Sequence, residues 1–152
     1  MNFQCEIKEQ SPQPTLSIRT RTPVDKLPLL LGEAYGKIAG YLAELGAQPA
    51  GAPFAAYYNM DMQDLDVEIG FPVAEPVAGK DDIQSSQVPG GRLAFALHTG
   101  PYADISPAYD ALTQFAKEQG YEPTGVSYEF YLNDPQETTP ENLQTQIIFP
   151  LK

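Results

Sequence analysis

The sequence has few of the residues that build catalytic and metal sites, and little positive charge. Among 152 residues there are one Cys, one His and no Trp, and 20 acidic residues outnumber 9 basic ones, for a net charge of −11. Cys5 has no partner for an internal disulfide and no basic neighbour to activate it, so it is interpreted as a packing residue. Without an excess of Lys and Arg, direct binding to nucleic acid is not expected.

Long hydrophobic runs are also missing. The longest, such as Leu27–Leu31, fall far short of the roughly 20 residues that span a bilayer, and the amino terminus lacks the basic and apolar regions of a signal peptide. The chain is nevertheless 42% hydrophobic, with 9 Tyr and 7 Phe, which is enough to form a core. We therefore expect a globular, cytoplasmic protein with no membrane partner.

Motifs for enzyme chemistry are equally scarce. His98 stands alone, with no Cys or second His to complete a metal site, and no Gly-x-Ser-x-Gly motif supplies a nucleophile. Pro89-Gly90-Gly91 is interpreted as a hairpin turn and not as a phosphate-binding loop. The residues themselves therefore predict no catalytic residue, no metal and no cofactor.

An internal repeat organises the chain. Residues 31–59 align with residues 105–133 at a constant offset of 74, with identities that include Tyr35/Tyr109, Gly46/Gly120 and Tyr57/Tyr131. We predict one domain over residues 1–152, in which repeat one covers about 1–73, a linker covers 74–80, and repeat two covers about 81–152.

Each repeat reads as strand, strand, helix, strand, strand. Hydrophobic residues recur at helical spacing over residues 26–45 and 107–119, and Gly46 and Gly120 are typical helix stops. Strands are predicted at residues 3–10, 15–22, 54–59, 65–71, 83–88, 92–99, 127–133 and 143–149. Since about 70 residues cover a sheet poorly on their own, the two units are expected to pack as one α+β domain with pseudo-twofold symmetry around a central groove.

Glu129 is the least expected residue of the predicted strands. It lies in the aromatic run Ser127–Asn133, where alternation places it on the same face as Tyr131. If buried, an unpaired carboxylate attracts positive charge, and aromatic rings add cation–π contacts. The repeat mates Tyr57 and Tyr131 on strands, and Tyr35 and Tyr109 on helices, either line such a site or pack the two halves.

The first helix also carries Gly32, Gly36 and Gly40 on one stripe. Glycine weakens a helix interior, so this stripe either serves the close approach of a ligand or partner helix, or marks a helix of low intrinsic stability.

Several segments resemble the GyrI-like effector-binding family. They are Gly120–Gly125, Glu129–Pro135, Thr139–Leu143, Ile147–Pro150, His98–Tyr102 and Asp66–Val73. This family includes the ligand-sensing domains of AraC-type and multidrug-responsive MerR-type transcription regulators, and the DNA gyrase inhibitor proteins. The resemblance extends over essentially the whole chain.

The resemblance implies duplicated β-β-α-β-β units, that is SHS2-like repeats, with a groove that binds lipophilic and often cationic small molecules. In the multidrug-sensing members a glutamate on the penultimate strand contacts the positive charge of the drug, and Glu129 stands at that position. By the same analogy Tyr131 lines the pocket, and Glu68 is a second acidic candidate.

Three functions remain open. Because the first strand is predicted to begin almost at Met1, we expect a stand-alone module without its own helix-turn-helix domain. The favoured function is small-molecule binding for sensing, sequestration or transcription regulation through a separate DNA-binding regulator chain. The alternatives are gyrase inhibition by protein contact and hydrolysis of electrophilic, cyclopropane-bearing compounds, with Glu129 as general acid or base.

Overall fold

The chain divides into two compact units. The computed structural model describes residues 4–134 and 137–152, so Phe3 of the first predicted strand and Pro135 and Gln136 of the family-like segment lie outside the described residues. Residues 12–89 form one unit, and the amino-terminal segment up to residue 11 joins residues 90–152 in the other. Each unit combines an antiparallel sheet with one long helix, which confirms the predicted α+β class.

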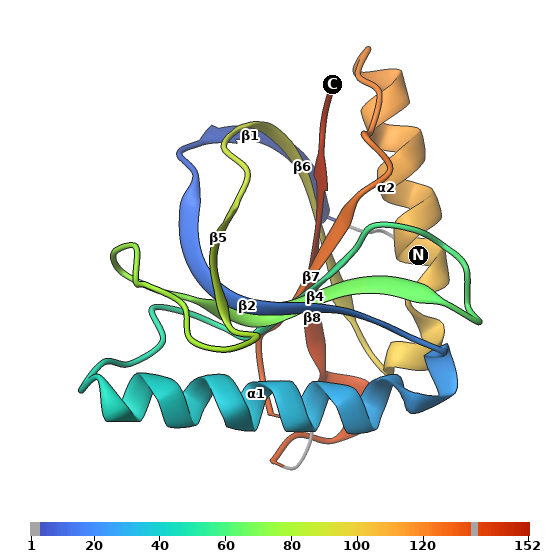
Figure 1. The fold of residues 1–152 in the computed structure, drawn as a ribbon. Coiled ribbons are helices and arrows are strands. Elements are labelled where there is room, and N and C mark those ends of the chain that lie inside the picture. Colours follow the sequence, from blue (N-terminus) through green and yellow to red (C-terminus); the bar gives the residue numbers. More distant parts are fainter. Residues whose placement is uncertain (1–3, 135–136) are drawn as a thin grey trace. The chain divides into compact units, whose positions relative to one another are not determined.

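The unit of residues 12–89 contains one helix and four strands. In chain order the elements are β2 (Gln13–Thr22), the 3-10 turn η1 (Val24–Lys26), α1 (Leu27–Glu44), β3 (Phe54–Tyr57), β4 (Leu65–Pro72) and β5 (Gln84–Val88). Within this unit the strands pair in the order β5-β2-β4-β3, all antiparallel. Helix α1 runs across one face of this sheet and buries Ala34, Ile38 and Leu42 (Figure 1).

The other unit has the same construction. Its elements are β1 (Gln4–Gln10), β6 (Gly91–Thr99), the 3-10 turn η2 (Tyr102–Asp104), α2 (Ser106–Glu118), β7 (Ser127–Tyr131), the 3-10 turn η3 (Pro140–Asn142) and β8 (Gln144–Pro150). The strands pair antiparallel in the order β1-β6-β8-β7. Helix α2 covers one face and forms a core with Ala94, Ala96, Ala108, Leu112, Ala116, Ile147 and Phe149.

The first strand of each predicted repeat pairs within the other repeat. Strand β1 pairs with β6 and not with β2, while β5 pairs with β2. The prediction of a hairpin at residues 89–91 is therefore wrong, because β6 lies between β1 and β8 and β5 is not its neighbour. The compact units consequently differ from the predicted repeats by exchange of their outer strands.

Local chemistry accounts for the ends of both helices. Gly46 and Gly120 adopt positive φ angles of 68° and 86°, the left-handed conformation that glycine reaches without steric cost.

The segment 74–80, predicted as a linker, lies in the unit of residues 12–89. There the Tyr41 hydroxyl of α1 donates to the carbonyl oxygen of Ala78 at 2.7 Å. In the described part of the chain, neither helix has the length and apolar character needed to cross a bilayer.

Candidate functional site: a tyrosine-bound glutamate on strand β7

Glu129 lies on the face of its sheet that α2 covers. In the antiparallel register it is opposite Ile147, a fully buried residue of the core beneath α2. Directly opposed residues of an antiparallel pair share one face, so the Glu129 side chain points toward the helix side. Tyr131 lies two residues further along β7 and therefore on the same face, as predicted from the alternation.

Two tyrosine hydroxyls bind the Glu129 carboxylate. Tyr109 of α2 donates to Oε2, and Tyr131 donates to Oε1 at 3.0 Å. The Tyr109 ring also lies against Phe149, with ring centroids 5.7 Å apart, so the helix core fixes its direction. Three residues singled out in the sequence thus come together: Glu129, Tyr131 and Tyr109.

Partial burial dominates the electrostatics of this carboxylate. It raises the pKa of Glu129, and the hydrogen bonds from Tyr109 and Tyr131 and the proximity of His98 oppose that rise only in part. Among the described residues, no Lys or Arg forms an ion pair with Glu129; the ion pairs involve other acidic groups. A cation placed at this carboxylate would compensate the cost of burying its negative charge.

Tyr102 is a further aromatic residue of the site. Its ring meets that of Tyr131 edge-on, at a centroid distance of 5.5 Å and an interplanar angle of 73°. Burial raises the pKa of the Tyr102 phenol, and the negative charges of Glu129 and Asp134 add to that effect. Sequence reasoning placed Tyr102 only inside a family-like motif, because a residue in a short 3-10 turn carries no periodic signal that relates it to β7.

His98 is the second residue that sequence reasoning did not assign to the site. It is 4% exposed, and its Nε2 lies 3.0 Å from the carbonyl oxygen of Pro101. In the register of β6 with β8 it is opposite Thr145, which in turn is opposite Tyr131. The register was the missing signal, because the sequence does not show which residues of neighbouring strands lie opposite one another.

The matching tyrosines of the other unit have different surroundings. The Tyr35 hydroxyl donates to the carbonyl oxygen of Phe54 at 2.9 Å, and its ring lies 5.3 Å from that of Phe71. Tyr57 is opposite Val67, as Tyr131 is opposite Thr145, and the position that matches Glu129 is occupied by Ala55. This unit therefore repeats the tyrosines without the carboxylate. Tyr35 and Tyr57 belong to this unit, and Glu129 belongs to the other.

Glu68 belongs to the unit of residues 12–89, where it lies on the sheet face that points away from α1. It is 4% exposed, and it accepts hydrogen bonds from Ser17 Oγ and Tyr58 Oη, both at 2.5 Å. The Arg19 guanidinium lies 3.9 Å from the centre of the Tyr58 ring. Glu68 is thus already bound by internal groups.

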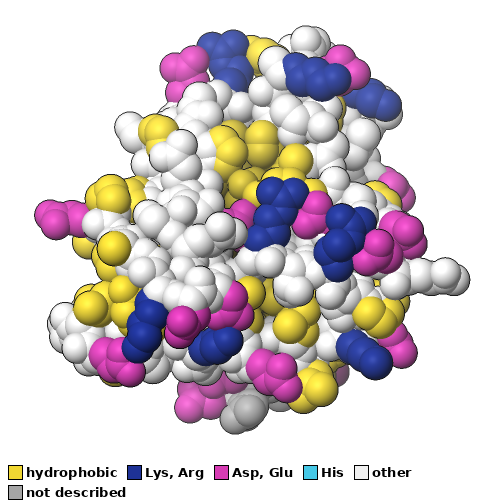
Figure 2. Space-filling view, in the orientation of Figure 1, with side chains coloured by type: hydrophobic (Ala, Val, Ile, Leu, Met, Phe, Trp, Pro, Cys, Tyr) yellow, Lys and Arg dark blue, Asp and Glu magenta, His cyan; other side chains and the backbone are white. Residues whose placement is uncertain are grey.

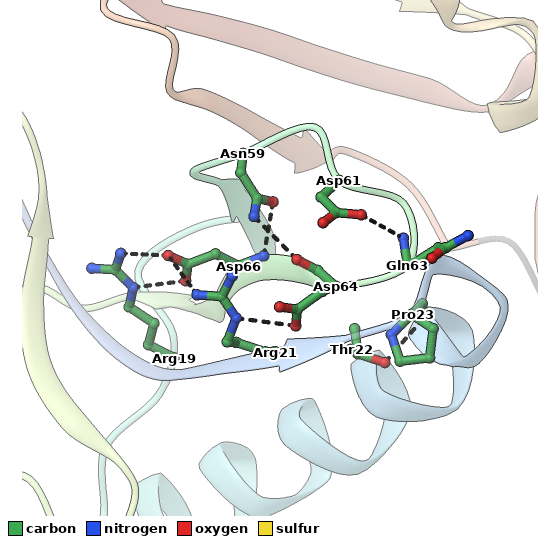
Figure 3. Close-up of polar contacts among 9 residues, drawn as sticks. All are labelled: Arg19, Arg21, Thr22, Pro23, Asn59, Asp61, Gln63, Asp64 and Asp66. Carbon is green, nitrogen blue, oxygen red and sulfur yellow. Dashed lines mark hydrogen bonds and ion pairs between the residues drawn. The ribbon is translucent and has the colours of Figure 1, made fainter.

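Two ion pairs lie near Glu68 along β2, β4 and the turn that precedes β4. Arg19 binds Asp66 through two hydrogen bonds, of 3.0 and 2.9 Å, and Arg21 binds Asp64 at 3.0 Å (Figure 3). On the face drawn in Figure 2, most basic side chains likewise lie next to acidic ones. In the residues that the structure covers, no group of three or more His, Cys, Asp or Glu is arranged to hold a metal ion.

A comparison with protein-family models identifies the family. Residues 3–152 match the GyrI-like small molecule binding domain. The chain belongs to the GyrI-like family. A search of curated proteins found no match to this GyrI-like domain.

Solved structures share the GyrI-like fold of this chain at low sequence identity. The C-terminal domain of EcmrR is 20% identical with a TM-score of 0.80, covering 100% of this chain and 99% of that one. EcmrR in complex with DNA is 22% identical with a TM-score of 0.83, and this chain, 99% covered, spans 57% of the EcmrR chain. SAV2435 bound to tetraphenylphosphonium is 12% identical with a TM-score of 0.66, covering 100% of this chain and 94% of that one. A hydrolase from Listeria innocua is 17% identical with a TM-score of 0.67, covering 98% and 92%.

Proposed function

We propose that this GyrI-like domain binds lipophilic cations at Glu129, for sensing, sequestration or transcription regulation through a partner. The observation that carries the proposal is the position of one carboxylate under α2, bound by two tyrosine hydroxyls and paired with no Lys or Arg of the described residues. The fold itself does not need a carboxylate at this position, since the matching position of the other unit is Ala55.

The aromatic residues support a preference for lipophilic cations over small inorganic ones. Tyr102 and Tyr131 meet edge to face beside the carboxylate, and Tyr109 approaches it from α2. A cation over an aromatic ring gains about 0.5–2 kcal/mol per contact, and apolar groups of the ligand gain more by leaving water. Charge and aromatic surface thus act on the same ligand class.

Two structural relatives agree with this proposal. SAV2435 was solved with tetraphenylphosphonium, a lipophilic cation, and EcmrR was solved with DNA. This chain spans only 57% of that EcmrR chain, so we do not propose that it binds DNA as EcmrR does. Regulation of transcription is proposed only through a DNA-binding partner.

Hydrolysis is a second candidate function. The raised pKa of Glu129 favours general acid–base chemistry on a bound electrophile, and a hydrolase from Listeria innocua shares the fold. The two functions are separated by product analysis. Binding without turnover of electrophilic, cyclopropane-bearing compounds supports a receptor, while turnover that is lost in Glu129→Gln supports an enzyme.

The proposal is tested by a thermal-shift comparison of three similar ligands that differ in charge. They are tetraphenylphosphonium, triphenylphosphine oxide and tetraphenylborate, which are cationic, neutral and anionic. A ligand at 100 times its dissociation constant stabilises the folded state by about 2.7 kcal/mol. In a domain of this size that raises the melting temperature by several degrees, at about 2–4 °C per kcal/mol. The phosphonium is expected to stabilise the fold more than the neutral oxide and far more than the borate, and equal shifts with the borate would contradict a charge-sensing site.

A further inference from the structure

Polar residues form a row across three strands beside Glu129. Tyr131 on β7 is opposite Thr145 on β8, and Thr145 is opposite His98 on β6. All three share the face that α2 covers, because directly opposed residues of antiparallel strands point to the same side. Thr145 is 0% exposed and His98 is 4% exposed, so this polar row runs through the interior of the unit.

Two buried atoms of the row have unused hydrogen-bonding capacity. Within the described residues, neither Thr145 Oγ1 nor His98 Nδ1 has a hydrogen-bond partner. The Pro101 carbonyl beside His98 Nε2 can only accept, so in the neutral imidazole the proton is on Nε2 and Nδ1 is an acceptor. Thr145 Oγ1 both donates and accepts. Such atoms are exceptions in folded proteins, where nearly all buried polar groups are paired.

The other unit shows that packing does not require the Thr145 hydroxyl or the Glu129 carboxylate. In the register of β4, Val67 is opposite both Tyr57 and Thr20, as Thr145 is opposite Tyr131 and His98. Where one unit has Glu129 and Thr145, the other thus has Ala55 and Val67. The additional polar groups occur on the same face as the carboxylate.

We propose that His98 Nδ1 and Thr145 Oγ1 form a second polar subsite, which takes a hydroxyl group of a cationic ligand bound at Glu129. This inference rests on the proposed function. A ligand hydroxyl donates its hydrogen to Nδ1 and accepts one from Thr145 Oγ1, which satisfies both buried atoms at once. Neighbouring strands are about 4.8 Å apart, so the hydroxyl lies one to two strand spacings from the β7 side chains. The ligand class is a lipophilic cation with a hydroxyl on an aromatic group.

The turn η2 follows His98 closely along the chain. His98 is bound through the Pro101 carbonyl, and the next residue, Tyr102, begins the three-residue turn η2, which has no buried residue. A ligand that displaces the partly exposed Tyr102 ring reaches the row from the Tyr131 side.

The test compares tetraphenylphosphonium with its meta- and para-hydroxyphenyl derivatives by isothermal titration calorimetry. At least one hydroxyl isomer is expected to bind the wild-type chain about tenfold more tightly than tetraphenylphosphonium, the scale of one to two neutral hydrogen bonds. Equal affinity of all three compounds overturns the subsite and leaves the role of Glu129 intact. If none of the three binds, both proposals are wrong.

Thr145→Val is the decisive variant, because it removes the hydroxyl and keeps the shape. It is expected to bind tetraphenylphosphonium like the wild type and to lose the hydroxyl preference. Thr15→Val is the matched control, since Thr15 Oγ1 of the other unit is also buried without a hydrogen-bond partner among the described residues. It should keep the preference.

Thermal melting of the two free variants adds a readout that needs no ligand. Both are expected to melt at a higher temperature than the wild type. A preference that persists in Thr145→Val overturns the inference. A lower melting temperature of free Thr145→Val also overturns it, because it would mean that the hydroxyl already has a partner.

Discussion

Tyr109 and Tyr35 occupy matching helix positions but donate to different acceptors, and this difference yields a quantitative prediction. Tyr109 donates to the Glu129 carboxylate, whereas Tyr35 donates to the backbone carbonyl of Phe54 at 2.9 Å. A hydrogen bond to a charged acceptor contributes about 1.5–3 kcal/mol to stability, and a neutral one about 0.5–1.5 kcal/mol. When Glu129 is ionised, Tyr109→Phe should therefore lower the free energy of unfolding more than Tyr35→Phe does.

The pH dependence distinguishes the two variants further. Burial raises the pKa of Glu129, and the Tyr109 hydrogen bond opposes that rise. Removing Tyr109 therefore penalises the ionised form. The full loss is expected above the raised pKa, and it shrinks as the pH falls through that pKa toward the ordinary value of 4.5, where the bond to the protonated carboxyl is a neutral one. The loss in Tyr35→Phe should not change, because a backbone carbonyl does not titrate over this range.

Urea unfolding of the wild type and both variants, at mildly alkaline and mildly acidic pH, measures these losses. The comparison is valid if the slope of the free energy of unfolding against urea concentration stays the same. Equal losses for the two variants, independent of pH, would refute the assignment of Tyr109 to an ionised Glu129.

Three further predictions concern binding, the helices and the surface. The affinity for tetraphenylphosphonium should fall as the pH drops through the raised pKa of Glu129, since protonation removes the charge that binds the cation; calorimetric titrations across this range measure it. Nothing lies within 4 Å of a Cβ added at Gly36, so Gly36→Ala should stabilise the chain by about 0.5–1 kcal/mol in thermal melts, whereas Gly120→Ala, at a φ of +86°, should destabilise it. Asp66→Asn should cost at most about 1 kcal/mol because its ion pair with Arg19 is exposed to solvent. Since that pair lowers the pKa of Asp66, the difference should disappear as acid protonates the wild-type carboxyl below pH 3.8, and it should shrink in concentrated salt.

The local structure was predictable because periodicity and glycine chemistry act over a few residues. Helical spacing located both helices, and Gly46 and Gly120 marked their ends. Strand pairing was less accessible. The turn-forming residues Pro89-Gly90-Gly91 predict a hairpin, whereas β5 and β6 belong to different units. Pairing between distant segments depends on tertiary packing, which a local pattern does not record.

The candidate site was predictable within one strand but not across neighbouring strands. Alternation along one strand put Glu129 and Tyr131 on one face, and the structure joins them by a hydrogen bond of 3.0 Å. The contributions of His98 and Thr145 depend on the register between β6, β8 and β7, which the sequence does not specify. The roles of Tyr57 and Tyr35 in ligand binding stay predictions, as does a groove between the two halves. The sequence-based role of Glu68 is also untested, but its hydrogen bonds from Ser17 and Tyr58 lead us to expect that it does not bind the cation.

The most direct measurement is the dissociation constant of tetraphenylphosphonium for the wild type, Glu129→Gln and Glu68→Gln. Glu68 is the matched control, because it is a buried glutamate in the other unit that already accepts bonds from Ser17 and Tyr58. Loss of the carboxylate charge at Glu129 should weaken binding by about 1.5–3 kcal/mol, roughly 10- to 150-fold, and leave the neutral phosphine oxide little changed. Glu68→Gln should bind like the wild type. An unchanged dissociation constant in Glu129→Gln, or an equal loss in Glu68→Gln, would contradict the account of Glu129 as the receptor for positive charge.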